Sequence, residues 1–114
     1  MPMEIIDENK GAVLFVSITG DLNAHTSPDF EKYLLGVIES GQTRIVVDGT
    51  NLKYISSAGL RVVLAACKML GLKKGKLSFC CMQDQVRDVF EVAGFGGVVS
   101  IFPSRETAEK FSRK

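Results

Sequence analysis

The feature that most constrains the fold of this chain is the alternation of helix-like and strand-like segments after its first 26 residues. Four segments have apolar residues at three- and four-residue spacing and are predicted helices: 27–40, 60–72, 84–93 and 106–112. Three short apolar runs between them are predicted strands: 45–47, 77–81 and 98–102. Such alternation is typical of sheets whose strands are joined by right-handed helical crossovers.

Two further strands are predicted ahead of this alternating region. Residues 3–7 are the first, and alternating β-branched and aromatic residues predict the second over 13–18. The Asn-Lys-Gly segment 9–11 is the predicted hairpin turn between them. The order β-β-α-β-α-β-α-β-α therefore predicts one α/β domain over residues 1–114, with a mixed sheet of about five strands and about four helices.

Boundary residues are clearest around the first helix and the strand after it. Ser27 is expected to cap the helix, ahead of a proline and an aspartate that suit its first turn. Gly41 is expected to end the helix in the left-handed conformation. The run 45–47 suits a central strand covered on both faces, ended by Asp48 and followed by a loop over 49–55.

Composition narrows the classes of function. Of 114 residues, 46% are hydrophobic and 24% charged, as in folded globular domains. The 14 basic and 13 acidic residues are dispersed and give a formal net charge of +1, so nucleic-acid binding is not expected. The chain has no signal-peptide pattern and no apolar run of about 18 residues. We therefore expect a cytoplasmic protein without direct membrane insertion.

The most distinctive loop is the Ser-Ser-Ala-Gly sequence 56–59, called here the serine turn. It places two hydroxyls just before a predicted helix, where unpaired N–H groups and the positive end of the helix dipole suit a phosphate. A serine at this position also caps a helix and stabilises it by about 1 kcal/mol. The motif by itself leaves both roles open.

The helix predicted over 60–72 is apolar on nearly every side. Its main polar side chains are Arg61 and Lys68. A helix of this kind needs burial almost all round, so its outer face is covered either by neighbouring helices or by a partner protein.

The serine turn belongs to a longer pattern that covers most of the chain. Its most specific residues are Gly20, Asp21, Leu22, Val46, Val47, Asp48, Leu52, Tyr54, Ile55, Ser56, Ser57, Ala58, Gly59, Leu60 and Arg61. This pattern resembles the anti-sigma factor antagonists, whose domain is called STAS. The resemblance implies a STAS-like domain over 1–114 that acts as a bacterial switch. Such a switch binds an anti-sigma factor, often a serine kinase, and so releases a sigma factor for transcription.

The resemblance also assigns the site. It places Ser57 on the serine that the kinase phosphorylates and a phosphatase restores, with Ser56 as the alternative acceptor. An acid is usual in the family where Ser56 stands, and often where Asn23 stands, so this chain has less negative charge there. The residues expected to contact the partner are Asp21, Asn23, Ser56, Ser57, Ala58, Gly59 and Arg61. The oligomeric state is left open.

Two other functions remain open at this point. Similar domains also occur as unphosphorylated subunits of larger sensory or lipid-transport assemblies. A small-ligand binder or hydrolase that uses Ser57 as nucleophile would need a base, and no Ser-His-Asp order surrounds His25, the one histidine. We therefore expect no catalytic residue and no cofactor.

The cysteines and two aspartates have simpler expected roles. Asp21 and Asp48 each follow a predicted strand and are expected to bond to loop backbone. Cys67, Cys80 and Cys81 lack metal-binding spacing, so no metal site or disulfide framework is expected. In a strand, Cys80 and Cys81 would face opposite sides, which favours structural thiols that cannot chelate one ion together.

Overall fold

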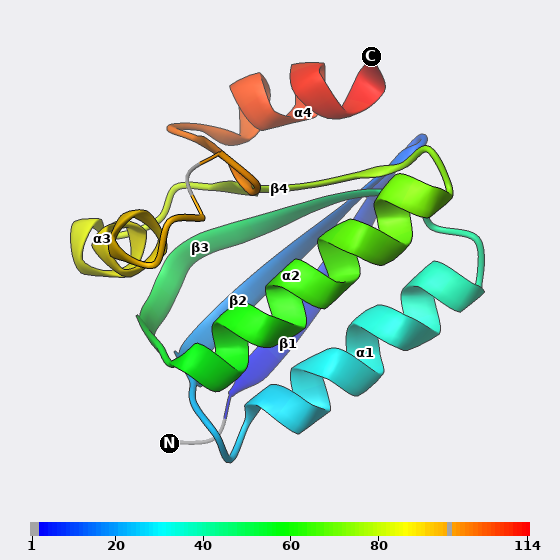
Figure 1. Ribbon diagram of the computed structural model, residues 1–114. Coiled ribbons are helices and arrows are strands. Elements are labelled where there is room, and N and C mark those ends of the chain that lie inside the picture. Colours follow the sequence, from blue (N-terminus) through cyan, green and yellow to red (C-terminus); the bar gives the residue numbers. More distant parts are fainter. Residues whose placement is uncertain (1–2, 96) are drawn as a thin grey trace.

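The sheet at the centre of the computed structural model has five strands in the order β1-β2-β3-β4-β5 (Figure 1). The structure describes residues 3–95 and 97–114. The strands are β1 (Glu4–Lys10), β2 (Val13–Leu22), β3 (Arg44–Ile55), β4 (Lys76–Cys80) and β5 (Ser100–Phe102). The helices are α1 (Ser27–Glu39), α2 (Ser57–Leu72), α3 (Asp84–Val92) and α4 (Arg105–Arg113). This order confirms the predicted mixed α/β sheet.

The sheet begins as an antiparallel hairpin and continues with parallel strands. β1 pairs antiparallel with β2, and Lys10 lies opposite Val13. The turn is therefore Gly11 and the residue after it, not 9–11, because Gly11 takes the left-handed φ of +63° that a tight hairpin needs. The pairs β2–β3, β3–β4 and β4–β5 are all parallel.

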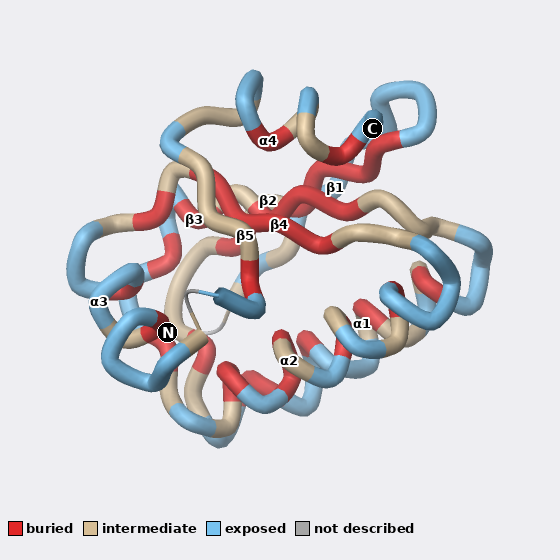
Figure 2. The backbone as a smooth tube through the Cα atoms, turned by 45° about the horizontal axis from the view of Figure 1, so that its top comes forward, coloured by how far each residue is buried: buried red, intermediate tan, exposed pale blue. Residues whose placement is uncertain are grey.

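The helices cover both faces of this sheet. α1 and α2 lie side by side on one face, and α4 lies across the other (Figure 1). Figure 2 shows buried residues concentrated on the central strands and on the inner sides of the helices. The larger core joins the sheet to α1, α2 and α3, while the smaller one under α4 consists of Val13, Phe15, Val46, Cys80 and Ala108. No helix in the described ranges is long and apolar enough to cross a membrane.

β3 is the strand where prediction and structure differ most. Ile45, Val46 and Val47 are fully buried, as predicted for a central strand. The predicted loop over 49–55 is wrong, because these residues continue β3 and pair with β2 as far as Ile55. Burial of Leu52 and Ile55, together with that pairing, outweighs the turn preference of the residues just after Val47.

The start of α1 also differs from the prediction. Thr26, not Ser27, is at the N-cap, and Ser27 is the first helical residue with a buried hydroxyl that has no hydrogen-bond partner in the described chain. The Thr26 hydroxyl donates to the Asp21 carbonyl oxygen at 2.6 Å, so it holds the preceding loop. Gly41 ends the helix with a φ of +107°, as predicted.

Candidate functional site

The serine turn lies where β3 passes into α2, and its two serines have different roles. Ser56 is extended, with φ −96° and ψ 174°, and its Oγ accepts a hydrogen bond from the Gly59 N–H at 3.3 Å. It is the N-cap of α2. Ser57 is the first helical residue, so α2 starts three residues before the predicted position. Ser57 is exposed, and its hydroxyl has no hydrogen bond to the described residues.

The end of β2 lies directly against this turn. The Ser56 N–H donates to the Leu22 carbonyl oxygen at 2.8 Å. A Cβ at Gly59 would lie 2.9 Å from Ile55 Cγ1 and 3.1 Å from the Leu22 oxygen. Only a residue without a side chain fits this approach unstrained, so Gly59 sets how closely α2 begins against β2.

Asn23 shapes the loop between β2 and α1. Its side-chain oxygen accepts from the N–H groups of His25 at 2.9 Å and Thr26 at 3.0 Å. This pattern is that of an Asx turn, in which a short polar side chain replaces backbone contacts. Asp21 lies inside β2 rather than after it, and it contributes its carbonyl oxygen to Thr26.

The predicted partner-binding residues gather at one end of the sheet. Asp21 pairs with Tyr54 and Leu22 with Ile55, so the ends of β2 and β3 lie side by side next to the start of α2. Of these seven residues, Ser57 and Arg61 are exposed and Gly59 is buried. The other four are half-buried: Asp21, Asn23, Ser56 and Ala58. Six of them are therefore accessible, and Gly59 acts through packing.

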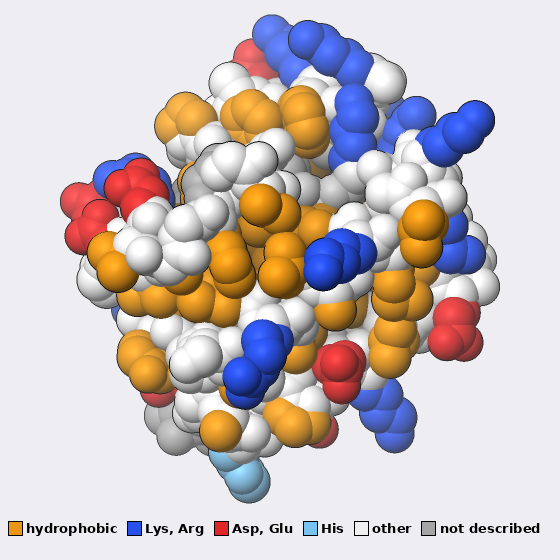
Figure 3. Space-filling view, viewed as in Figure 1, with side chains coloured by type: hydrophobic (Ala, Val, Ile, Leu, Met, Phe, Trp, Pro, Cys, Tyr) orange, Lys and Arg blue, Asp and Glu red, His pale blue; other side chains and the backbone are white. Residues whose placement is uncertain are grey.

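A groove of about 400 Å³ opens beside the serine turn, between the starts of α1 and α2. Pro28 and Glu31 line it from α1, and Ala58, Arg61 and Ala65 line it from α2. Figure 3 shows this face of the molecule, where hydrophobic side chains are bordered by scattered charged ones. α1 thus covers part of α2, while the first turns of α2 stay open.

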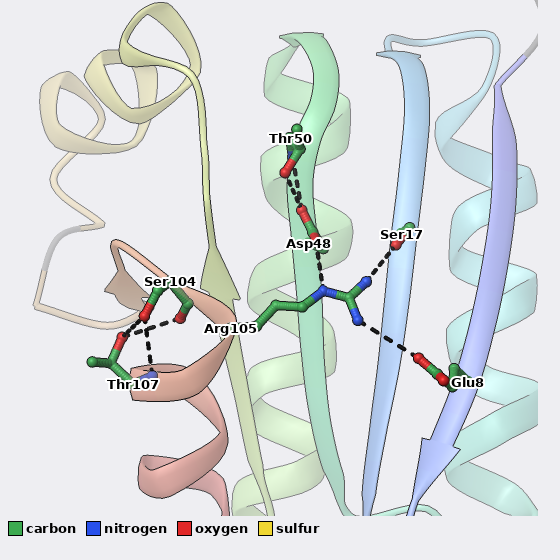
Figure 4. A network of polar contacts seen from close by, with 7 residues as sticks. All are labelled: Glu8, Ser17, Asp48, Thr50, Ser104, Arg105 and Thr107. Atoms are coloured by element: carbon green, nitrogen blue, oxygen red, sulfur yellow. Dashed lines mark hydrogen bonds and ion pairs between the residues drawn. The ribbon is translucent and has the colours of Figure 1, made fainter.

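A second polar cluster lies on the opposite face of the sheet, under α4 (Figure 4). Arg105 Nε donates to Asp48 Oδ2 at 2.7 Å, and Arg105 Nη2 donates to Ser17 Oγ at 3.0 Å. Arg105 Nη1 lies 3.7 Å from Glu8 Oε1, and the guanidinium lies 5.0 Å from the centre of the Phe15 ring. Arg105 therefore ties α4 to β1, β2 and β3. Sequence analysis missed this contact because no local pattern joins residues 57 positions apart.

Asp48 is held in its charged form by these contacts. Burial opposes ionisation, but hydrogen bonds from Thr50 and Arg105 and the charge of Arg105 outweigh it, so the pKa of Asp48 lies below its usual value. A carboxyl whose pKa is depressed on folding stabilises the protein above its unfolded pKa, and this contribution is lost as pH falls through the folded pKa.

We predict that Arg105→Met lowers the free energy of unfolding by about 1–2 kcal/mol near pH 7, because a charged hydrogen bond is lost from a partly exposed pair. The gap from the parent should start to narrow as pH falls below about 4, the ordinary pKa of an unfolded aspartate, and should narrow further as pH falls through the lower pKa of folded Asp48. Urea unfolding of the parent and the variant across this pH range measures the difference in stability and its change with pH. Arg87→Met, which removes an exposed pair with Asp84, is the control and should change little. A gap that is independent of pH would contradict this account.

Cys80 and Cys81 do not face opposite sides, contrary to the prediction. β4 ends at Cys80, and Cys81 takes a left-handed φ of +60° while its N–H donates to the Phe102 carbonyl oxygen at 3.2 Å. The possible ligand atoms of Asp48, Cys80 and Cys81 all lie within 4.8 Å of one another. Burial, with smaller contributions from Cys81 and Asp48, raises the pKa of the Cys80 thiol far above its usual value.

Comparison with known proteins agrees with this architecture. The STAS domain family matches residues 4–108. The chain belongs to the STAS domain family. This STAS domain is 36% identical to the putative anti-sigma factor antagonist BtrV of Bordetella bronchiseptica, over 93% of this chain and 91% of that protein. It is 28% identical to the anti-sigma F factor antagonist of Paenibacillus polymyxa, over 95% of this chain and 93% of that protein.

Solved structures show the same fold. A putative anti-sigma factor antagonist from Thermotoga maritima superimposes with a TM-score of 0.91 at 17% identity, covering 96% of this chain and 95% of that one. The unphosphorylated form of the anti-sigma factor antagonist SpoIIAA gives a TM-score of 0.82 at 21% identity, covering 96% of each chain. These likenesses confirm the predicted STAS fold.

Proposed function

We propose that this STAS domain is an anti-sigma factor antagonist that binds an anti-sigma factor through the surface around the serine turn. The names of its curated relatives support this class of function. The observation that carries the proposal is the exposed Ser57 hydroxyl at the first residue of a 16-residue helix, beside an open groove. A partner that covers this surface would bury Ser57.

Phosphorylation of Ser57 would switch this interaction off. A phosphoserine carries about −1.5 to −2 charges at neutral pH, and a partner that covers Ser57 would have to desolvate them. Within the domain, the same charge lies at the positive end of the α2 dipole, one turn from exposed Arg61. The phosphate would therefore weaken the complex without unfolding the domain.

Ser57 is the better phosphate acceptor of the two serines. The Ser56 hydroxyl is used in capping α2 through Gly59, whereas Ser57 is exposed. We infer that the anti-sigma factor is also the kinase that modifies Ser57, and that a phosphatase reverses the reaction. Release of the sigma factor would then depend on the fraction of Ser57 that is unmodified.

We predict that Ser57→Asp weakens binding to the anti-sigma factor of its own organism by about tenfold or more. The partner would bury the aspartate charge without an opposite charge to pair with it, which is costly at an interface. Isothermal titration calorimetry measures this. Ser57→Ala should bind like the parent. Ser56→Ala should lower the free energy of unfolding by about 1 kcal/mol through loss of the cap. Equal affinity for Ser57→Asp and the parent would remove the proposed switch.

A second experiment locates the modification itself. The protein is incubated with ATP and the kinases of its own organism, and phosphate is mapped by mass spectrometry. We expect phosphate on Ser57. Phosphate on neither Ser57 nor Ser56 would favour the unphosphorylated subunit of a larger assembly.

A further inference from the structure

Cys80, Cys81 and Asp48 form a cluster on the sheet face that α4 covers, away from the serine turn. Asp48 on β3 lies directly opposite Cys80 on β4. The left-handed backbone of Cys81 turns its thiol toward the same cluster, which brings the three ligand atoms within 4.8 Å of one another. In the described parts of the chain this is the one such group of three metal-ligating side chains.

The donor set matches a particular kind of ion. Two thiols and a carboxylate are ligands of zinc, a borderline-soft cation that takes sulfur and oxygen in tetrahedral sites. Hard cations such as Mg²⁺ prefer oxygen ligands throughout, so the two sulfurs disfavour them.

Thr50 and Arg105 hold the Asp48 carboxylate in place through hydrogen bonds. Asp48 Oδ1 accepts from the Thr50 hydroxyl at 2.6 Å and from the Thr50 N–H at 2.9 Å, and Oδ2 accepts from Arg105 at 2.7 Å. Such hydrogen bonds orient ligating carboxylates in metal sites. A divalent ion with two thiolates and one carboxylate leaves one negative charge, which Arg105 balances. The site would therefore be neutral with its nearest cation included.

The cluster also has access to solvent. Cys80 is buried, but Cys81 is half-buried and lines a groove of about 420 Å³ together with Met82, Arg87 and Phe102. An ion can therefore enter past Cys81. With three protein ligands, a tetrahedral zinc ion would take a water as its fourth ligand.

We propose that Cys80, Cys81 and Asp48 form a binding site for Zn²⁺. Each thiol gives its proton to solvent as its sulfur–zinc bond forms, and no group is oxidised or reduced. Because the ligands come from β3, from the end of β4 and from the residue after it, and the supporting cation comes from α4, zinc binding stabilises the junction of these elements. The inference does not depend on the proposed anti-sigma function.

The test is a zinc titration of the reduced full chain against a chromophoric zinc indicator. Cys81→Ser removes the accessible ligand, and Cys67→Ser, a partly buried thiol of α2, is the matched control. We expect one equivalent of Zn²⁺ to bind to the parent and to Cys67→Ser. Cys81→Ser should bind about tenfold more weakly or worse, since even supporting residues of metal sites contribute about this factor.

Cobalt(II) gives an independent readout that does not depend on the indicator. The parent and Cys67→Ser should develop thiolate-to-cobalt charge-transfer absorption, and Cys81→Ser should lose most of it. Zinc should raise the thermal midpoint of the parent more than that of Cys81→Ser. The proposal is overturned if the parent does not compete with the indicator, if Cys81→Ser binds like the parent, or if Cys67→Ser loses binding equally.

Discussion

Phe79→Ala should lower the free energy of unfolding by about 4 kcal/mol, the loss typical of a large aromatic side chain removed from a core. Phe79 lies on β4 and is fully buried. Its ring centre is 5.3 Å from that of Phe90, one of the two buried residues of α3. The substitution removes apolar burial and leaves a cavity next to the contact that holds α3.

Urea unfolding measures this loss as a lower midpoint with an unchanged slope. Leu72→Ala is the control, because Leu72 is 89% exposed at the end of α2, and its truncation should change stability by less than about 0.5 kcal/mol. Amide exchange in α3 should quicken with Phe79→Ala, since Phe90 loses its partner. A loss below about 2 kcal/mol would mean that the core collapses around the site.

Much of the fold could be predicted because its signals are local. The spacing of apolar residues identified all four helices, and the run 45–47 identified the strand that is covered on both faces. The second half of β3 was missed because Asp48, Gly49 and Thr50 favour a turn when considered alone. Its extended form depends on pairing with β2, which is set by residues about 30 positions earlier in the chain.

The position of the serine turn before a helix was predicted, but the separate roles of its two serines were not. Only the structure shows that the Ser56 hydroxyl caps α2 and that Ser57 is exposed. Cys81 was misjudged for the same kind of reason. A left-handed residue other than glycine is uncommon, and here it accompanies a hydrogen bond to Phe102, a residue on another strand.

β3 contributes to both polar regions of the molecule, the Arg105 cluster and the serine turn, and these lie on different faces of the sheet. Asp48 faces α4 and pairs with Arg105, whereas the end of the strand at Ile55 leads into the serine turn. Asp48 therefore lies on the face that α4 covers, away from Ser57 and the serine turn. Substitutions under α4 should therefore change stability or metal binding with little effect on the proposed partner surface.

Gly75→Ala should lower the free energy of unfolding by about 3 kcal/mol, toward the upper end of the range for overpacking. A Cβ at Gly75 would overlap the carbonyl oxygen of Thr43, which cannot move freely because it accepts the Lys76 N–H at 2.8 Å. The Gly75 N–H itself donates to the Leu70 carbonyl oxygen at 2.7 Å, so neither chain segment can shift without losing a hydrogen bond.

A matched glycine separates this clash from the general effect of adding a methyl group. Gly36 lies in α1, and a Cβ there would meet no heavy atom within 4 Å. Gly36→Ala should raise stability by about 0.5–1 kcal/mol, because alanine favours the helix. Urea unfolding of both variants shows whether each substitution lowers or raises the free energy of unfolding. If Gly75→Ala were as stable as Gly36→Ala, the close approach of the α2–β4 connection to Thr43 would not limit the fold.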